Sequence, residues 1–158
     1  MSNATFRGGV HPYEGKELSK DLPIKQVNLP GEYVFPMAQH IGAPATPIVE
    51  KGDKVLVGQK IGEASGFISA NICSSVSGTV KAVEPRMLLN GSKATCVVIE
   101  NDEENKGNEM LREDLDYTKL SNDAHRDIVK EAGVVGMGGA GFPTNVKLAP
   151  KEPDKIDY

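Results

Sequence analysis

Residues 31–100 alternate between short apolar runs and glycine-containing turns, which is the pattern of a small all-β region. The runs are rich in valine and isoleucine, and they predict strands at Tyr33–Met37, Lys54–Val57, Lys60–Ala64, Thr79–Val83 and Thr95–Glu100. The turns between them contain Gly52, Gly58, Gly78 and Gly91. Strands of this length and spacing favour a small sandwich or barrel.

The segments on either side of this region have a different pattern. Residues 1–30 hold few periodic apolar positions and several glycines and prolines, so we expect an extended arm. Residues 101–120 are rich in acidic side chains and predict a solvated linker. The chain therefore divides into an arm, a β-region, a linker and a C-terminal segment.

A short amphipathic helix is predicted directly after the linker. Its apolar positions, Ala124, Ile128 and Ala132, recur every fourth residue. Ser121 suits the N-cap position, because its hydroxyl can accept a backbone N–H of the first turn. Gly133 is a natural stop, because glycine adopts the left-handed conformation that ends many helices.

Composition supports a folded chain and excludes several function classes. Of 158 residues, 39% are apolar and 25% are charged, which provides enough apolar side chain for a packed core. The net charge of −4 would repel a phosphate backbone, so nucleic acid is not an expected partner. The sequence has no run of about 18 apolar residues, so we expect a soluble chain without a membrane-spanning helix.

The metal-ligating residue types are too few and too scattered for a metal site. Cys73 and Cys96 are the only cysteines, and an iron–sulfur cluster or an all-cysteine zinc site needs four. His11, His40 and His125 lie far apart, and none has a second histidine at a ligand spacing. We expect structural hydrogen bonds for the first two histidines and a solvated position for His125.

One stretch resembles lipoyl and biotinyl carrier domains. Val49–Gly62 repeats their Gly-Asp turn, strand and Gly-Gln turn, and Ser75–Val80 resembles their later Ser-Gly-Thr-Val segment. The resemblance implies a barrel-sandwich hybrid fold. A carrier attaches its cofactor to a lysine at an exposed hairpin tip, but the corresponding segment Ala64–Asn71 contains no lysine. A carrier function is therefore disfavoured, and Phe67 and Ile68 at this tip would instead mark a contact surface or pack locally.

Five glycines between residues 133 and 141 form the segment with the clearest chemical potential. Glycine lets consecutive backbone N–H groups form a concave anion site, and a helix beginning near Thr144 would add its dipole. Lys147 follows at a distance from which it can return to the same anion, and Phe142 could offer an apolar wall to a planar ring. The alternative is that these glycines serve packing alone. The string is neither a P-loop nor a dinucleotide-binding fingerprint.

The order Gly-Gly-Ala-Gly-Phe-Pro-Thr resembles the flavin-binding loop of the NADH-oxidising subunit of respiratory complex I. Met137 stands where that subunit has an arginine, which removes one cation from the loop. Four motifs in order resemble the C subunit of the Rnf electron transport complex: Phe6–Pro12, Pro36–Ala45, Gly66–Ala70 and Ala132–Thr144. Cys73 lies where a histidine is expected in those relatives, and it is assigned no role.

The resemblance implies a peripheral subunit on the cytoplasmic face of the bacterial cell membrane, in a ferredoxin:NAD+ oxidoreductase that translocates ions. It implies FMN and NAD(H) as cofactors, together with two [4Fe-4S] clusters whose cysteine ligands are absent from this chain. Expected partners are the other Rnf subunits, NAD(H) and, indirectly, ferredoxin. No residue is assigned to catalysis or to a metal. Cofactor binding is assigned to Gly136, Gly138, Gly139, Ala140, Gly141, Phe142 and Lys147.

The expected fold is mainly β. A barrel-sandwich hybrid over residues 31–100 is followed by a short α-helix and by the glycine-rich start of an α/β flavin-binding domain, truncated, over residues 121–158. In the Rnf family this domain continues beyond Tyr158, so we expect an N-terminal fragment that is catalytically inactive alone. The alternative function is a non-catalytic docking module for other subunits of the complex.

Overall fold

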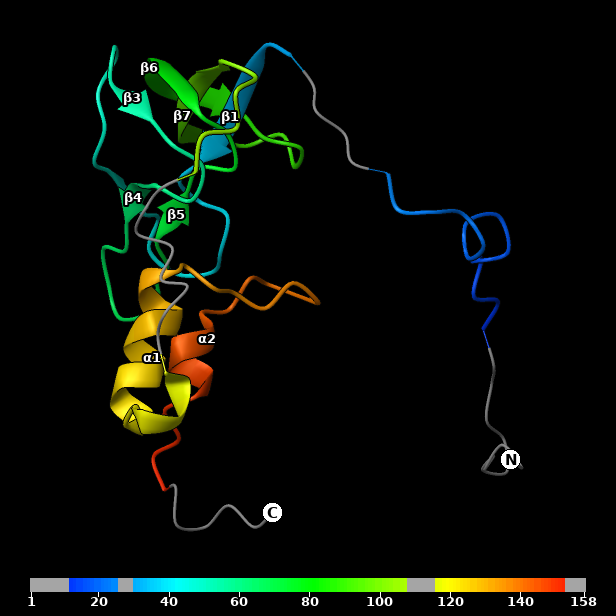
Figure 1. Ribbon diagram of the computed structural model, residues 1–158, viewed down its shortest axis with the longest axis vertical. Coiled ribbons are helices and arrows are strands. Elements are labelled where there is room, and N and C mark those ends of the chain that lie inside the picture. The colour runs from blue at the N-terminus through cyan, green and yellow to red at the C-terminus, as the bar shows by residue number, and fades with distance from the viewer. Residues whose placement is uncertain (1–11, 26–29, 108–115, 153–158) are drawn as a thin grey trace.

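The computed structural model describes residues 12–25, 30–107 and 116–152. Residues 12–25 extend away from the remainder of the chain (Figure 1). The strands are β1 (Glu32–Pro36), β2 (Thr46–Pro47), β3 (Lys54–Val55), β4 (Lys60–Glu63), β5 (Ile72–Cys73), β6 (Gly78–Met87) and β7 (Lys93–Asn101). Within the described residues they are followed by a 3₁₀ turn, η1 (Tyr117–Lys119), and by the helices α1 (Asn122–Glu131) and α2 (Thr144–Lys147).

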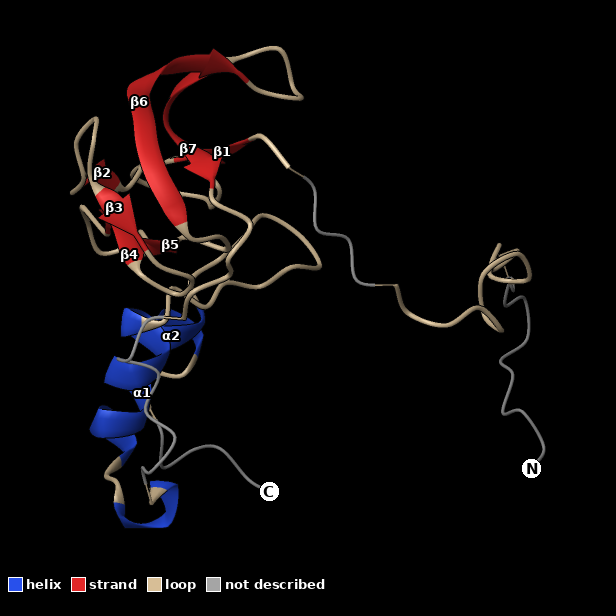
Figure 2. Ribbon diagram, turned by 45° about the horizontal axis from the view of Figure 1, so that its top comes forward, coloured by secondary structure: helices blue, strands red, loops and turns tan. Residues whose placement is uncertain are grey.

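The described strands form two antiparallel sheets, which together we call the β-domain. One sheet has the order β1-β7-β6-β3 and the other the order β2-β4-β5. The long β6–β7 hairpin curls over the smaller strands, and the two helices lie together beyond one end of the sheets (Figure 2). Strand β3 pairs only with Gly78 and Thr79 at the start of β6, so the rest of β6 extends past this neighbour. The prediction of a mainly β fold is confirmed.

The core lies between the inner faces of the two sheets. Ile61 from β4 and Ile72 from β5 meet residues of the larger sheet, among them Phe35, Val80 and Ile99. In β7 the four consecutive residues from 96 to 99 are completely buried. Successive side chains of a strand point to opposite faces, so the burial of all four shows that β7 is covered on both faces, while β1 and β6 pair with its two edges.

All five strands predicted from the sequence are present, with different ends. The β6 strand continues four residues beyond the predicted end at Val83, and the turn through Asn90 and Gly91 joins it to β7. In that turn Gly91 has a φ of 79°, a left-handed conformation that suits glycine. The two-residue strands β2 and β5 were not predicted, because two residues are too short to show an alternating pattern.

Helix α1 begins and ends as the sequence predicts. The Ser121 hydroxyl accepts the backbone N–H of Ala124 at 3.2 Å. At the other end Gly133 has a φ of 66°, and the Val134 N–H donates to the carbonyl of Val129. These bonds satisfy N–H and carbonyl groups that a helix end otherwise leaves to water.

The division into an arm, a β-region, a linker and a truncated flavin-binding domain stays a prediction. Residues 1–11 and 26–29 of the arm, 108–115 of the linker and 153–158 at the end lie outside the described residues. Within residues 116–120, Asp116 caps the η1 turn by accepting the N–H of Thr118.

Candidate functional site

The glycine-rich loop, residues 133–144, is a narrow hairpin that extends from the end of α1 to the start of α2. Its base is closed by two backbone hydrogen bonds of 2.9 Å, from Gly136 to the Phe142 carbonyl and from Thr144 to the Val134 carbonyl. A turn over residues 137–140 forms its tip. The hairpin is the orange segment that extends sideways from the body in Figure 1.

The tip of this loop leaves its backbone open to solvent. A Cβ atom added at Gly138 or Gly139 would meet no heavy atom within 4 Å. Met137 is 96% exposed. Within the described ranges, no acceptor is present for the N–H groups of Met137, Gly138 and Gly139. These groups are therefore free to donate to an anion.

Lys147 lies against the base of the loop. Helix α2 starts at Thr144 as predicted, and its last residue returns the Lys147 ammonium so close to Gly136 that a Cβ there would overlap Nζ. No described carboxylate forms an ion pair with this ammonium. The structure therefore brings a cation to the glycine-rich loop, and a side chain at position 136 would displace the ammonium from this position.

The predicted site residues occupy three parts of the loop. Gly136 and the half-buried Phe142 form the base, where the ring of Phe142 is only partly accessible. Gly138, Gly139 and Ala140 belong to the tip. Gly141 is packed against the β-domain and has a φ of 68°. Among residues 133–141 only Gly133 and Gly141 have a left-handed backbone. The other three glycines do not use the positive φ angles that glycine permits.

The loop and α1 are held to the β-domain by residues that the sequence analysis did not single out individually. Asn71 donates from its side-chain amide to the carbonyl oxygens of Lys130 and Glu131, at 3.4 and 3.3 Å. The Lys60 ammonium lies 3.1 Å from the Glu131 carboxylate, and this hydrogen bond is the main cause that raises the pKa of Lys60. No local sequence pattern predicts these contacts, because they join residues about 60 to 70 positions apart.

A second contact joins the loop to the segment between β1 and β2. The Ile41 N–H donates to the carbonyl of Ala140 at 2.9 Å. A Cβ atom at Gly141 would lie 2.9 Å from the Gln39 carbonyl oxygen and 3.0 Å from His40 Cα. Gln39, His40 and Ile41 lie in one of the four motifs that resemble the Rnf protein, and of the three only His40 had an expected role, in structural hydrogen bonding.

The segment at the carrier-like tip is tied down rather than extended. Ser69 donates from its hydroxyl to the Ala43 carbonyl at 2.8 Å, and the Ser65 hydroxyl donates to the Pro44 carbonyl. Phe67 is 84% exposed, so of the two alternatives for this position its ring fits a contact surface and not local packing. The segment therefore packs against residues 43–44 and presents one aromatic ring to solvent.

The remaining candidate groups have structural surroundings. His40 is 8% exposed, and its two ring nitrogens contact the backbone of Ile41 and Ala70, which confirms the predicted structural role. His125 is only partly exposed and contacts the Ser121 carbonyl, whereas His11 lies outside the described residues. Both cysteines are free thiols, and burial raises the pKa of each.

The described residues offer neither a clustered metal site nor a helix that could span a membrane. Within residues 12–25, 30–107 and 116–152, no three or more histidine, cysteine or acidic side chains cluster so that they could hold a metal ion. No helix within those ranges is long and apolar enough to cross a bilayer.

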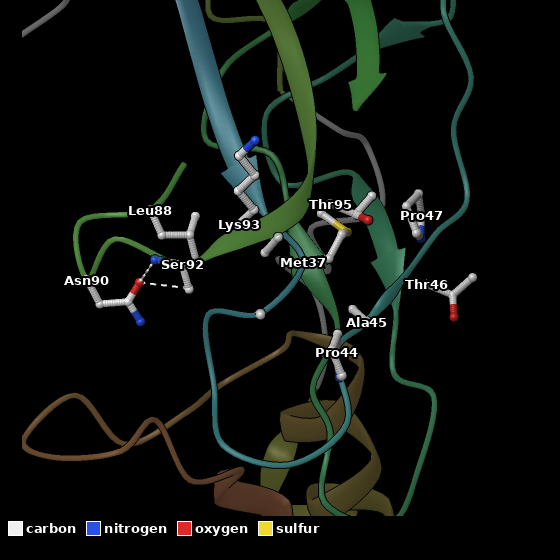
Figure 3. A pocket seen from close by; sticks show the side chains of 12 residues that line it. Met37, Pro44, Ala45, Thr46, Pro47, Leu88, Asn90, Ser92, Lys93 and Thr95 are labelled. Atoms are coloured by element: carbon white, nitrogen blue, oxygen red, sulfur yellow. Dashed lines mark hydrogen bonds between the residues drawn. The ribbon is translucent and has the colours of Figure 1, made fainter. Parts of the chain in front are cut away.

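A shallow pocket of about 540 Å³ lies beside the β6–β7 turn (Figure 3). Met37, Pro44 and Ala45 form one side, and Leu88 and Lys93 belong to the hairpin. The Asn90 side chain at its rim is held by Ser92, whose N–H and hydroxyl both donate to it. Lys93 is the one ionisable residue among those that line it, so this pocket offers no acid–base pair.

Comparison with known proteins identifies the family. The family described as "RnfC Barrel sandwich hybrid domain" matches residues 4–104. The chain is 42% identical to the C subunit of the Na(+)-translocating ferredoxin:NAD(+) oxidoreductase complex of Acetobacterium woodii, over 99% of this chain and 35% of that protein. It is 41% identical to the proton-translocating counterpart of Clostridium ljungdahlii, over 97% of this chain and 34% of that protein.

A more distant relative agrees with this assignment. The C subunit of the ion-translocating oxidoreductase complex of Vibrio cholerae serotype O1 is 37% identical over 90% of this chain and 19% of its own length. The chain thus spans about a third or less of the curated relatives it matches. The predicted barrel-sandwich hybrid and the resemblance to the Rnf protein are both confirmed. With two sheets that enclose one core and a family match over residues 4–104, this chain belongs to the RnfC barrel-sandwich hybrid domain family.

Proposed function

We propose that this chain is the N-terminal part of the C subunit of an ion-translocating ferredoxin:NAD+ oxidoreductase complex. The proposal is supported by the identity of 42% and 41% to two such proteins over nearly the whole chain. In such a complex electrons pass between NAD(H), FMN and iron–sulfur clusters. The protein would be peripheral, on the cytoplasmic face of the membrane, and its partners would be the other subunits and, through them, ferredoxin.

Within this function, the role of the chain is to hold the phosphate of FMN or of NAD(H) at the glycine-rich loop. The open N–H groups of Gly138 and Gly139 and the nearby ammonium of Lys147 suit a phosphate. Bound flavin would supply the hydride chemistry, and the loop would supply binding and orientation. A [4Fe-4S] cluster uses four cysteine ligands, and this sequence has two cysteines. Residues outside this sequence would therefore have to supply ligands for such a cluster.

The observation that carries this proposal is the glycine-rich loop, whose tip has backbone donors without acceptors among the described residues and whose base lies against the Lys147 ammonium. It is tested by titrating FMN into the chain and following the quenching of flavin fluorescence. Gly139→Asp adds a negative charge at a position with open space, so it should abolish saturable binding without a steric clash.

Gly107→Asp is the matched control. Gly107 also has open space around its Cα, and it contacts the β-domain at Val57, outside the loop. Saturable quenching that Gly139→Asp removes and Gly107→Asp retains supports the proposal. Absence of saturable binding to the unaltered chain up to about 1 mM FMN, or equal binding by both variants, contradicts a flavin role for the loop.

The second candidate function is a non-catalytic docking module. It is favoured by the exposed apolar side chains of the described arm, where Leu18 is 90% exposed and Ile24 fully exposed, and by Phe67 at the carrier-like tip. Mixing the chain with the purified other subunits and measuring co-migration in size-exclusion chromatography tests it. Leu18→Glu or Phe67→Glu should weaken a complex that these surfaces form, whereas Leu89→Glu on the β6–β7 turn is an equally exposed control.

A further inference from the structure

The segment Gln39–Gly42, which we call the brace, is the part of the β-domain that touches the glycine-rich loop on its tip side. The Ile41 N–H donates to the Ala140 carbonyl at 2.9 Å, directly beside the open turn. Gly141 approaches so closely that a Cβ would lie within 2.9 Å of the Gln39 carbonyl oxygen. The brace therefore contacts the last residue of the tip turn and the residue after it.

The brace is itself fixed by the side chain of His40. The ring is 8% exposed, and Nδ1 lies 3.1 Å from the Ile41 carbonyl oxygen. Nε2 lies 3.2 Å from the Ala70 backbone nitrogen and 3.1 Å from the Ala70 carbonyl oxygen. It accepts the Ala70 N–H when the ring proton is on Nδ1 and donates to the Ala70 carbonyl when the proton is on Nε2, so either tautomer bonds to Ala70. His40 thus joins the brace to the segment that precedes β5.

Gly42 fixes the other end of the brace. It has a φ of 92°, and a Cβ there would overlap the carbonyl oxygen of Ile68. The next residue, Ala43, donates its N–H to that same carbonyl at 3.0 Å. A larger residue at position 42 must therefore move the brace away from Ile68 or break this bond.

From these contacts we propose that the brace orders the tip of the glycine-rich loop for its anionic ligand, with His40 and Gly42 as positioning residues. The proposal rests on the phosphate-binding function proposed above. The tip has little other support, since a Cβ at Gly138 or Gly139 would meet nothing within 4 Å, whereas α1 is separately anchored by Asn71. Ordering a flexible loop costs affinity when a ligand binds, so a loop ordered in advance binds more tightly.

The test uses the 158-residue chain with Gly42→Ala, His40→Ala and His40→Gln. Gly42→Ala and His40→Ala should each weaken FMN binding by about fivefold, the effect of roughly one lost hydrogen bond. His40→Gln should recover part of the affinity, because its amide can accept from Ala70. A visible circular dichroism band of bound FMN should weaken in the first two variants and reappear in the third.

Gly52→Ala is the matched control for backbone strain. Gly52 has a φ of 100°, close to that of Gly42, but no atom lies within 4 Å of its added Cβ. Gly52→Ala should lower the melting temperature while leaving FMN affinity unchanged. FMN affinity equal to that of the unaltered chain in both Gly42→Ala and His40→Ala would overturn the brace proposal.

Amide hydrogen exchange tests the brace without FMN, so the two proposals fail separately. The Gly136 N–H, bonded to the Phe142 carbonyl at the base of the loop, should exchange faster in Gly42→Ala and His40→Ala. The N–H of Ala132, bonded inside α1, should keep its protection. An unchanged exchange rate of the Gly136 N–H in both variants overturns the brace proposal, even if the chain binds FMN. A faster rate supports the brace proposal, even if the unaltered chain binds no FMN.

Discussion

The side-chain amide of Asn71 donates to the carbonyl oxygen of Glu131 across 3.3 Å, although the two residues are 60 positions apart. The same amide reaches the Lys130 carbonyl, and its oxygen accepts the Ala64 N–H at 2.9 Å. A helix ends with carbonyl groups that lack partners, and here the β-domain supplies the partner. One buried side chain therefore closes the loop after β4 and attaches α1 to the sheets.

Replacing Asn71 by alanine should destabilise the chain by about 2 kcal/mol. The side chain is 4% exposed, so its loss leaves the Ala64 N–H and the helix carbonyls without their partner in a largely dry region. The free energy of unfolding in urea measures the effect. Asn90→Ala is the control, since Asn90 lies in an exposed turn, and a loss no larger than the control's would refute the attachment role.

Truncating Ile61 should be more damaging than truncating Ile48. Ile61 is completely buried in the core cluster, whereas Ile48 is 47% exposed. Ile61→Ala should reduce the free energy of unfolding by about 2–5 kcal/mol through lost apolar contacts and a residual cavity. Ile48→Ala should cost clearly less. Thermal and urea unfolding of both variants provide the comparison, and similar losses would argue against a core between the sheets.

Ser77 should stabilise the chain more at neutral pH than in acid. Its hydroxyl donates to the Asp102 carboxylate at 2.6 Å, and this bond is the first cause that lowers the pKa of Asp102. A carboxyl whose pKa is lowered on folding stabilises the chain at pH values above its unfolded pKa of about 3.9. That stability disappears as the pH falls through the lower pKa of the folded state.

The Ser77→Ala variant isolates this pH dependence. Its loss of unfolding free energy should be larger at pH 7 than at about pH 2, and the part that remains in acid reflects the Lys106 N–H that the same hydroxyl accepts. Ser92→Ala, whose hydroxyl bonds the exposed and uncharged Asn90, should show no such difference. Equal losses by Ser77→Ala at both pH values would contradict the contribution of Asp102.

Lys147→Gln should weaken the binding of FMN by about tenfold but leave riboflavin unaffected. Riboflavin lacks the phosphate, so only FMN can gain from an ammonium beside Gly136. Fluorescence titrations with both flavins measure the difference, and they are repeated at higher salt, where the effect should shrink. Lys93→Gln, at the pocket beside the β6–β7 turn, is the control. Equal losses for both flavins would show that Lys147 acts through the fold instead.

The two thiols should react slowly with iodoacetamide, and at different rates. Burial raises the pKa of both, which reduces the reactive thiolate at neutral pH. Cys96 is completely buried and Cys73 only partly, so Cys73 should be modified first and Cys96 only on unfolding. Mass spectrometry of the labelled chain, with Cys73→Ser as control, follows the order. Rapid labelling of Cys96 in the folded chain would contradict its position in β7.

Local features of this fold were readable from the sequence, and long-range contacts were not. The Ser121 cap and the Gly133 stop depend on neighbouring residues, so both could be predicted. The strands β2 and β5 form because their partners are present, and neither has a pattern of its own.

The same distinction applies to the candidate site. The glycines and Lys147 could be named from one short string, and their proximity follows from the start of α2 at Thr144. The brace lies about 100 residues earlier, and nothing in Gln39 or Ile41 as residue types predicts a contact with Gly141 or Ala140. The pairing arises from how the β-domain and α1 pack, which no local pattern encodes.

The extension of β6 past β3 has a consequence for self-association. Strand β3 covers only the first two residues of β6, so the far half of that strand has an open edge among the described residues, on the side away from β7. Open edges can add a strand from another molecule and begin aggregation. Pro85 lies in this half and lacks the N–H that such an added strand would need, and Glu84 and Arg86 place charges on either side of it. The hairpin can therefore curl beyond its neighbour without offering a continuous template to a second chain.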